Sequence, residues 1–274
     1  MRQALCAAML LLAGTFSASA QTSPAQRGPL VSTPDVIKDL APTGKVRAAI
    51  NLGNSVLAQK GDDGPKGITV DLARELGKRL AVPVELVTFE AAGKVFEAMK
   101  AGAVDVAFIA IEPVRAAEIE FTAPYVHIEG TYMVPKDSAL KVIDDVDRAG
   151  VRIAVGRGSA YDLYLTRTIK NATLVRAATG GGSAMINLFR DEKLEVAAGV
   201  KQPLVEYAKS HSDVRVMDGR FMVIRQAMGT PKGRTAGAGY LSAFIEEMKA
   251  SGFVADALKR SNQPDAAVAP PATN

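Results

Sequence analysis

The sequence has 274 residues, of which 48% are hydrophobic and 23% charged, and its formal net charge is +4. These proportions are ordinary for a globular protein, and the length suits one large or two modest domains. Lys and Arg form no long run, aromatic residues make up only 5%, and Trp is absent. Nucleic acid is therefore not expected as a partner, because binding it requires clustered cations or aromatic stacking surfaces.

The first 20 residues have the features of a cleaved secretory signal. Arg2 provides a positive start, the apolar stretch from Ala4 to Gly14 is too short to span a bilayer, and Ala18-Ser19-Ala20 matches the small-x-small cleavage rule. We expect cleavage after Ala20 and a periplasmic location. Cys6 is the only cysteine and lies in this segment, so the mature chain would contain no disulfide.

A polar turn follows the first predicted strand. A helix capped by Thr33 is predicted to run through Leu40, and Lys45 to Ile50 is predicted to be the first strand. The turn that follows contains Asn51 and Asn54. Because ligands bind at the carboxyl ends of parallel strands, both asparagines are candidate ligand-binding residues. The alternative is an ordinary loop between a strand and a helix.

Residues 67–125 alternate between helical and strand patterns. Leu72, Leu76 and Leu80 share one helical face, whereas Val104 to Ala110 is a nearly continuous apolar run, typical of a strand covered on both faces. Such alternation predicts a parallel sheet with helices on its faces. The carboxyl end of the apolar strand is therefore a predicted position for a ligand.

Glu112 and Arg115 come directly after this apolar strand. A guanidinium presents a fixed fork of N–H donors that matches a carboxylate bidentately, which makes Arg115 the leading candidate for binding an acid. A solvated arginine on a loop is the alternative. Position in the chain alone does not decide between these two roles.

Three phrases occur in order here: GITVDLA, AGAVDVAF and EPVRAAEIEFTAPY. Together they resemble the bacterial periplasmic solute-binding proteins of family 3, which serve ABC transporters for polar amino acids. The resemblance extends from about Lys45 to about Arg260. It implies an α/β fold of the type II periplasmic-binding-protein kind, with two lobes that are each a mainly parallel sheet flanked by helices, joined by a two-stranded hinge.

The resemblance also implies a division of the chain. Lobe 1 is expected to be discontinuous, with residues 43–127 and 226–261, and lobe 2 to comprise residues 130–222. Strand and helix patterns indeed start again at Val151. The Pro/Ala-rich segment 262–274 is predicted to be a disordered tail.

In the family, an arginine at the position of Arg115 holds the carboxylate of the ligand. A second phrase, from Gly158 to Tyr161, lies between a strand and a helix of lobe 2, where helix-end N–H groups and the Ser159 hydroxyl would hold the same carboxylate. Ala160 stands where the family has a second hydroxyl. The candidate ligand-binding residues are therefore Asn51, Asn54, Glu112, Arg115, Gly158, Ser159, Ala160, Tyr161, Val200 and Lys201.

Two departures from the family pattern concern the rest of the ligand. Val200 and Lys201 stand where family members that bind amino acids carry an aspartate for the ammonium, and Asn54 and Ala92 stand where they commonly carry aromatic residues. Because a buried charge needs a partner, we expect small mono- or dicarboxylates, or carboxylates with a neutral polar substituent, to bind more tightly than the common amino acids. Other carboxylates that could hold an ammonium are Glu112, Glu129 and Asp162.

The sequence thus predicts a monomeric binding protein, not an enzyme, that captures a small carboxylate-bearing solute, an amino acid or an organic acid, and delivers it to an inner-membrane ABC permease. One alternative is a dehydratase for cyclohexadienyl acids such as prephenate or arogenate, with Glu112 as the nearest general acid. Another is a soluble sensor for a membrane receptor. No cofactor or metal is expected, because His127 and His211 are the only histidines and no cysteine joins them.

Overall fold

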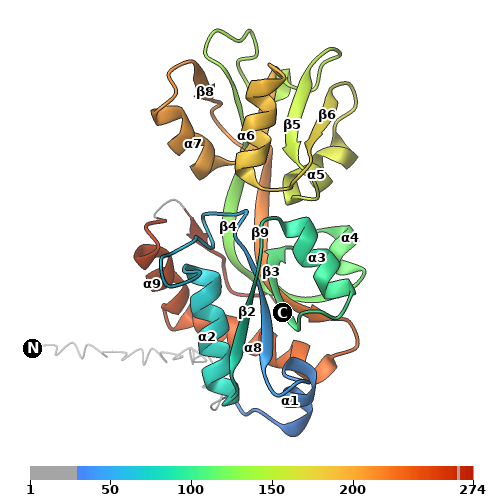
Figure 1. Cartoon of the computed structure of the whole chain (residues 1–274), viewed down its shortest axis with the longest axis vertical. Coiled ribbons are helices and arrows are strands. Elements are labelled where there is room, and N and C mark those ends of the chain that lie inside the picture. Colours follow the sequence, from blue (N-terminus) through green and yellow to red (C-terminus); the bar gives the residue numbers. More distant parts are fainter. Residues whose placement is uncertain (1–29, 264–265, 274) are drawn as a thin grey trace, which may run out of the picture. The chain divides into compact units, whose positions relative to one another are not determined.

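The computed structural model describes residues 30–263 and 266–273, and the predicted signal segment, residues 1–20, lies outside them. The described elements form two groups, which we call lobe 1 and lobe 2 (Figure 1). Lobe 1 contains α1 (Pro34–Leu40), β1 (Val46–Asn51), α2 (Ile68–Leu80), β2 (Val84–Phe89), α3 (Ala92–Lys100), β3 (Val106–Ala110), α4 (Pro113–Ala116), α8 (Thr235–Ala250) and α9 (Phe253–Arg260). Lobe 2 contains the short 3-10 helix η1 (Ile143–Asp145), β5 (Arg152–Gly156), α5 (Ala160–Thr168), β6 (Thr173–Ala177), α6 (Gly182–Asp191), β7 (Val196–Val200), α7 (Lys201–Lys209) and β8 (Val214–Val216). Two long strands, β4 (Ile119–Pro135) and β9 (Met222–Pro231), belong to both lobes.

Helix α1 illustrates how local sequence sets an element's bounds. The Thr33 hydroxyl oxygen accepts a hydrogen bond from the Val36 amide at 3.4 Å, Pro34 lies in the first turn, and Asp35 places a negative charge at the helix N-terminus. The helix ends at Leu40, so its predicted bounds are confirmed. None of the described helices is both long and apolar enough to cross a bilayer.

The sheet combines two parallel groups of strands. In lobe 1, β1 lies between β2 and β3 and is parallel to both, and in lobe 2, β5 lies in the same way between β6 and β7. Strands β9 and β4 join these groups as antiparallel strands, which gives the order β2-β1-β3-β9-β4-β7-β5-β6. The predicted fold class, with mainly parallel sheets flanked by helices, is confirmed.

Each lobe packs its helices on its own part of the sheet. In lobe 1, Val95 and Met99 of α3 pack with Ile109 of β3, and all five residues of β3 are buried, as the apolar run predicts. In lobe 2, Met185 and Phe189 of α6 belong to a second buried cluster. Because the strand faces are covered by these helices, polar side chains gather at the carboxyl ends of the strands.

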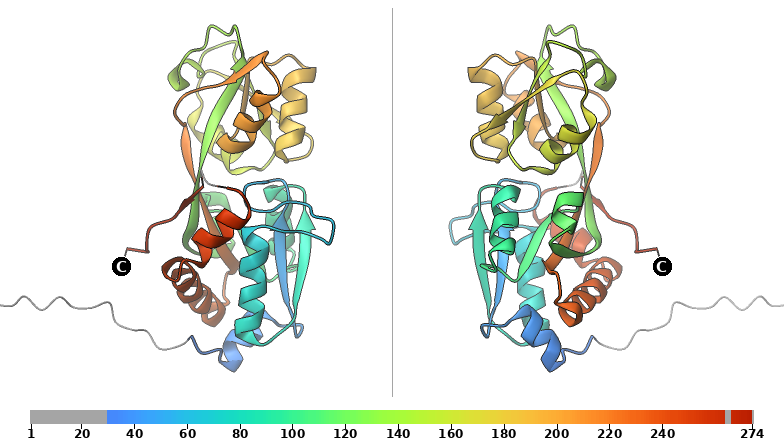
Figure 2. Two further views of the ribbon diagram at one scale, coloured as in Figure 1. Left: turned by 90° about the vertical axis from the view of Figure 1, so that its left-hand side faces the viewer. Right: turned by 90° about the vertical axis from the view of Figure 1, so that its right-hand side faces the viewer.

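The chain passes between the lobes twice, along β4 and β9. These strands form an antiparallel ladder in which Val126 pairs with Gln226 and Gly130 pairs with Met222. The ladder connects the two lobes in every view, with β4 in green and β9 in orange (Figures 1 and 2). The predicted two-stranded connection is therefore present.

The C-terminal segment differs from its prediction. Ala267–Val268 form β10, which pairs antiparallel with Val126 and His127 of β4, and the Ala269 amide donates to the Tyr125 carbonyl at 3.0 Å. This part of the tail is an ordered strand, contrary to the expected disorder. The physical reason is that β4 offers the tail unpaired backbone groups on the edge opposite β9.

Candidate ligand-binding site

A small cavity, of about 40 Å³, lies where strand ends of lobe 1 face those of lobe 2. Its lining includes the ends of β1, β3 and β7 and the loop between β5 and α5, as expected for a site in sheets of this kind. The described residues that line it are Asn51, Gly53, Asn54, Ala92, Ile109, Ala110, Arg115, Ser159, Ala160, Tyr161, Gly180, Val200, Ile224 and Gln226. Arg115 is the one charged side chain in this lining.

The sequence prediction and the cavity overlap in seven residues: Asn51, Asn54, Arg115, Ser159, Ala160, Tyr161 and Val200. The other three candidates, Glu112, Gly158 and Lys201, do not line it. Gln226 was not predicted, although a buried polar residue within the apolar strand β9 is a signal that could have identified it.

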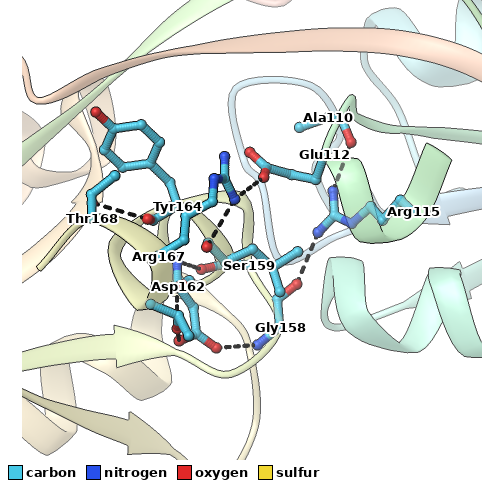
Figure 3. Close-up of polar contacts among 11 residues, drawn as sticks. Ala110, Glu112, Arg115, Gly158, Ser159, Asp162, Tyr164, Arg167 and Thr168 are labelled. Carbon is cyan, nitrogen blue, oxygen red and sulfur yellow. Dashed lines mark hydrogen bonds and ion pairs between the residues drawn. The ribbon is translucent and has the colours of Figure 1, made fainter. Parts of the chain in front are cut away.

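Arg115 is positioned by α4, a single turn that begins with Pro113 at a favoured position. Its side chain is only 1% exposed, and its two terminal nitrogens donate to the Ala110 carbonyl at 2.9 Å and to the Gly158 carbonyl at 2.8 Å (Figure 3). The second bond connects lobe 1 to lobe 2. Two backbone carbonyls leave the other N–H donors of the guanidinium for a further acceptor.

The electrostatics of Arg115 are set by its burial. Burial lowers the pKa of Arg115 to about 10, and the nearby charge of Glu112 opposes this shift only in part. The guanidinium stays charged at neutral pH, but it is held in a dry environment without a carboxylate as a hydrogen-bond partner. An anion entering the cavity would provide that partner.

Glu112 does not line the cavity and is paired with a cation of lobe 2. Its carboxylate is buried, at 3% exposed, and accepts a hydrogen bond from Nη1 of Arg167 at 2.6 Å (Figure 3). Arg167 lies on α5, so this ion pair also connects the two lobes. Gly158, the partner of Arg115 in lobe 2, is in the left-handed backbone region (φ +69°), and its amide donates to Asp162 at 2.8 Å.

Ser159 forms the N-terminal cap of α5. Its hydroxyl oxygen accepts from the Asp162 amide at 3.0 Å, and its hydroxyl also interacts with the Tyr161 side chain. In the cavity wall, Oδ1 of Asn54 is buried and has no hydrogen-bond partner among the described residues. The site thus combines one cation with neutral polar groups.

Lys201 lies in a different place from the one expected. Its ammonium binds Glu129 at 2.9 Å and lines a separate, more open hollow of about 830 Å³. Arg220 binds the same carboxylate at 2.6 Å, and hydrogen bonds from Lys201 and Arg220 hold the pKa of Glu129 below its usual range. Asp162 is likewise paired, with Arg176 at 2.9 Å.

Comparison with known proteins agrees with this architecture. The pattern of the family "Bacterial extracellular solute-binding proteins, family 3" matches residues 54–261. None of the curated proteins is similar enough to this sequence to match it.

Solved structures share the fold at low sequence identity. A solute receptor for L-cysteine of Neisseria gonorrhoeae has 21% identity and a TM-score of 0.71, and the match covers 83% of this chain and 92% of that chain. An amino acid ABC transporter substrate-binding protein from Streptococcus pneumoniae, solved with L-arginine, has 19% identity and a TM-score of 0.69, with 82% and 99% covered. An ancestral amino acid-binding protein, described as a precursor of cyclohexadienyl dehydratase, has 20% identity and a TM-score of 0.68, with 82% and 98% covered.

These structures and the two-lobed sheet define the class as the type II periplasmic-binding-protein fold. The family pattern spans well over half of the sequence. The chain therefore belongs to the bacterial extracellular solute-binding proteins of family 3.

Proposed function

We propose that this protein captures a small carboxylate-bearing solute between its lobes and delivers it to an inner-membrane ABC permease. The observation that carries the proposal is Arg115, a buried guanidinium that lines the cavity and has no carboxylate as a hydrogen-bond partner among the described residues. A ligand carboxylate would complete its hydrogen bonds and offset the cost of burying its charge. The permease as partner is what membership of the family implies.

Several polar side chains in the cavity wall could also contact such a ligand. Asn54 has a free buried oxygen, and Asn51, Ser159, Tyr161 and Gln226 are further polar groups in the wall. Such groups orient a polar ligand and give specificity in pockets of this kind. We infer that the protein acts as a monomer in the periplasm after cleavage behind Ala20. The cleavage site lies outside the described residues and stays a prediction, which N-terminal sequencing of the mature chain would check.

The enzymatic alternative gains no support from Glu112. A general acid has to be protonated and within reach of the reacting group, whereas this carboxylate is ion-paired with Arg167 at 2.6 Å and does not line the cavity. Binding without chemistry is therefore the function that we propose.

The test uses a panel of four amino acids, each paired with the acid that lacks its amino group: L-alanine and propionate, L-valine and 3-methylbutanoate, L-glutamate and glutarate, and L-phenylalanine and 3-phenylpropionate. We expect at least one of them to stabilise the wild-type protein in a thermal-shift assay. In Arg115→Ala, calorimetry with that compound should show binding weakened by about 2–5 kcal/mol, because the ligand carboxylate loses its buried partner.

Arg157→Ala is the matched control, since Arg157 is an exposed arginine on the neighbouring loop and is absent from the cavity wall. It should retain the wild-type affinity. Equal affinities of Arg115→Ala and the wild type would contradict the proposal.

A further inference from the structure

The ligand class follows from the acidic side chains around Arg115, and this inference rests on the proposed function. Glu112 lies three positions before Arg115, its backbone carbonyl accepts from the Arg115 amide at 2.9 Å, and its charge acts on the Arg115 guanidinium. Its carboxylate does not line the cavity, but a free charge at this position would attract the ammonium of an amino acid whose carboxylate is on Arg115. The structure instead places Arg167 on it.

Arg167 is held in this position by its own lobe. Its Nη1 also donates to the Leu163 carbonyl at 2.9 Å, and its guanidinium lies over the ring of Tyr164, 5.3 Å from the ring centre. Tyr164 in turn stacks on Phe221 with ring centres 6.0 Å apart. These contacts lie within lobe 2 and hold the Arg167 guanidinium in the position from which it binds Glu112.

Two further acidic side chains near the junction of the lobes are also paired with cations. Asp162 is bound by Arg176 at 2.9 Å, and Glu129 by Lys201 at 2.9 Å and Arg220 at 2.6 Å. Within the described residues, the cavity wall itself contains no Asp or Glu. An ammonium enclosed there would lack a carboxylate partner, and an unpaired buried charge is very unfavourable.

We propose that Arg167, by neutralising Glu112 across the cleft, makes the site select carboxylates that carry no ammonium group. The neutral polar groups Asn51, Asn54 and Gln226 remain for a hydroxyl or keto substituent on such an acid. Arg167 is a positioning residue in this scheme: it acts through Glu112 and does not line the cavity. The Glu112–Arg167 pair consequently has two effects, one on charge and one on contact between the lobes.

The first experiment measures the ratio of affinities within each of the four matched pairs, such as L-glutamate and glutarate, by calorimetry. For the wild type we expect the acid without the ammonium to bind at least about tenfold more tightly than its amino acid. Tighter binding of the amino acids would overturn the inference while leaving the proposed function intact. If no carboxylate in the panel bound at all, the proposed function itself would fail, and this inference with it.

Two variants separate the effect on charge from the effect on lobe contact. Arg167→Gln and Glu112→Gln both remove the ion pair between the lobes, but only Arg167→Gln leaves a carboxylate charge beside Arg115. We expect the preference for the acid to fall by about tenfold or more in Arg167→Gln and to persist in Glu112→Gln. Arg167→Lys retains a cation opposite Glu112 and should restore the wild-type ratio.

The matched control is Arg190→Gln. Arg190 also forms a 2.6 Å ion pair, with Asp213, and is 39% exposed against 43% for Arg167, but it lies outside the cavity wall. Its affinity ratio should equal that of the wild type. An unchanged ratio in Arg167→Gln, or the same loss of preference in Glu112→Gln, would show that the ion pair does not set the charge preference of the site.

Discussion

Two glycines, Gly93 and Gly158, lie close together where the lobes approach each other near the site. A Cβ atom on Gly93 of α3 would lie 3.5 Å from Cα of Gly158, which is an ordinary contact distance. There is room for a methyl group at this point and little more. The same approach holds the Gly158 carbonyl at 2.8 Å from Arg115, so a larger side chain at position 93 would separate both contacts.

We therefore expect Gly93→Ala to bind ligand with nearly wild-type affinity and to stabilise α3 by up to about 1 kcal/mol, because alanine favours the helix. Gly93→Leu should weaken binding by about tenfold or more, since its side chain would hold the lobes apart. Calorimetry with the tightest-binding compound of the panel measures both variants. Equal affinities for the alanine and leucine variants would show that the lobes do not close at this point.

At the level of single residues, the sequence predicted the position of Arg115 correctly because a strand end and a recognisable phrase determine it. It could not predict that Arg167, 55 positions after Glu112 and in the other lobe, pairs with it. Lys201 was expected beside the ligand, yet as the first residue of α7 it pairs with Glu129 and only its neighbour Val200 lines the cavity. Contacts between side chains of different lobes depend on geometry that no local pattern encodes.

At the level of elements, Asp105 connects the start of β3 to β1 and to the segment before α8 through hydrogen bonds. Its carboxylate is fully buried and accepts from the backbone amide and the guanidinium of Arg47 on β1, with two side-chain contacts of 2.9 Å. Arg234, just before α8, binds it at 2.9 Å and also donates to the Asp39 carbonyl at 2.7 Å. This aspartate of the AGAVDVAF phrase thus stabilises lobe 1 and lies away from the cavity.

Asp105→Asn should lower the free energy of unfolding by about 3 kcal/mol at neutral pH, because it leaves two arginines without their buried partner. Burial raises the pKa of Asp105, but hydrogen bonds from Arg47 and Arg234 outweigh it, so the folded pKa lies below its ordinary value of 3.8. The carboxylate therefore contributes stability above about pH 4, and this contribution is lost as the pH falls below that value. Urea unfolding of both proteins between neutral and acid pH should show their difference shrinking below about pH 4.

Glu85→Gln provides the control for this prediction. Glu85 forms an exposed ion pair with Lys45, so its loss should cost less than about 1 kcal/mol. If the difference in free energy of unfolding between wild type and Asp105→Asn grew on acidification, the stabilising role of the Asp105 carboxylate would be contradicted.

Most elements could be predicted because each has a local pattern. The strand expected at Lys45–Ile50 is observed at Val46–Asn51, and the apolar run Val104–Ala110 contains β3, observed at Val106–Ala110. Strand β10 was missed for the opposite reason. Its two residues have no strand pattern of their own, and they become a strand only because the edge of β4 lies beside them.

At the level of the whole molecule, two strands connecting two lobes suggest closure about the β4–β9 ladder. We expect saturating ligand to shift the protein toward its compact form, with neither lobe changing internally. Small-angle scattering of the wild type should then show a smaller radius of gyration with ligand than without it. Arg115→Ala should show no such change at the same ligand concentration, and an unchanged radius in the saturated wild type would argue against closure.

The place of β9 in the sheet has a consequence for the order in which the protein is assembled. In lobe 1 this strand lies between β3 and β4, so the central hydrogen bonds of the lobe that starts the chain require residues as late as Pro231. Apart from the β4–β9 ladder, the described strand pairs of lobe 2 lie within residues 119–216. During synthesis from the N-terminus, the second lobe can thus complete these ladders while β3 still waits for its partner, the reverse of the usual N-terminal-first order. Strand β3 thus emerges early but gains its second neighbour only when β9 follows, so its edge stays open until nearly the whole chain has emerged.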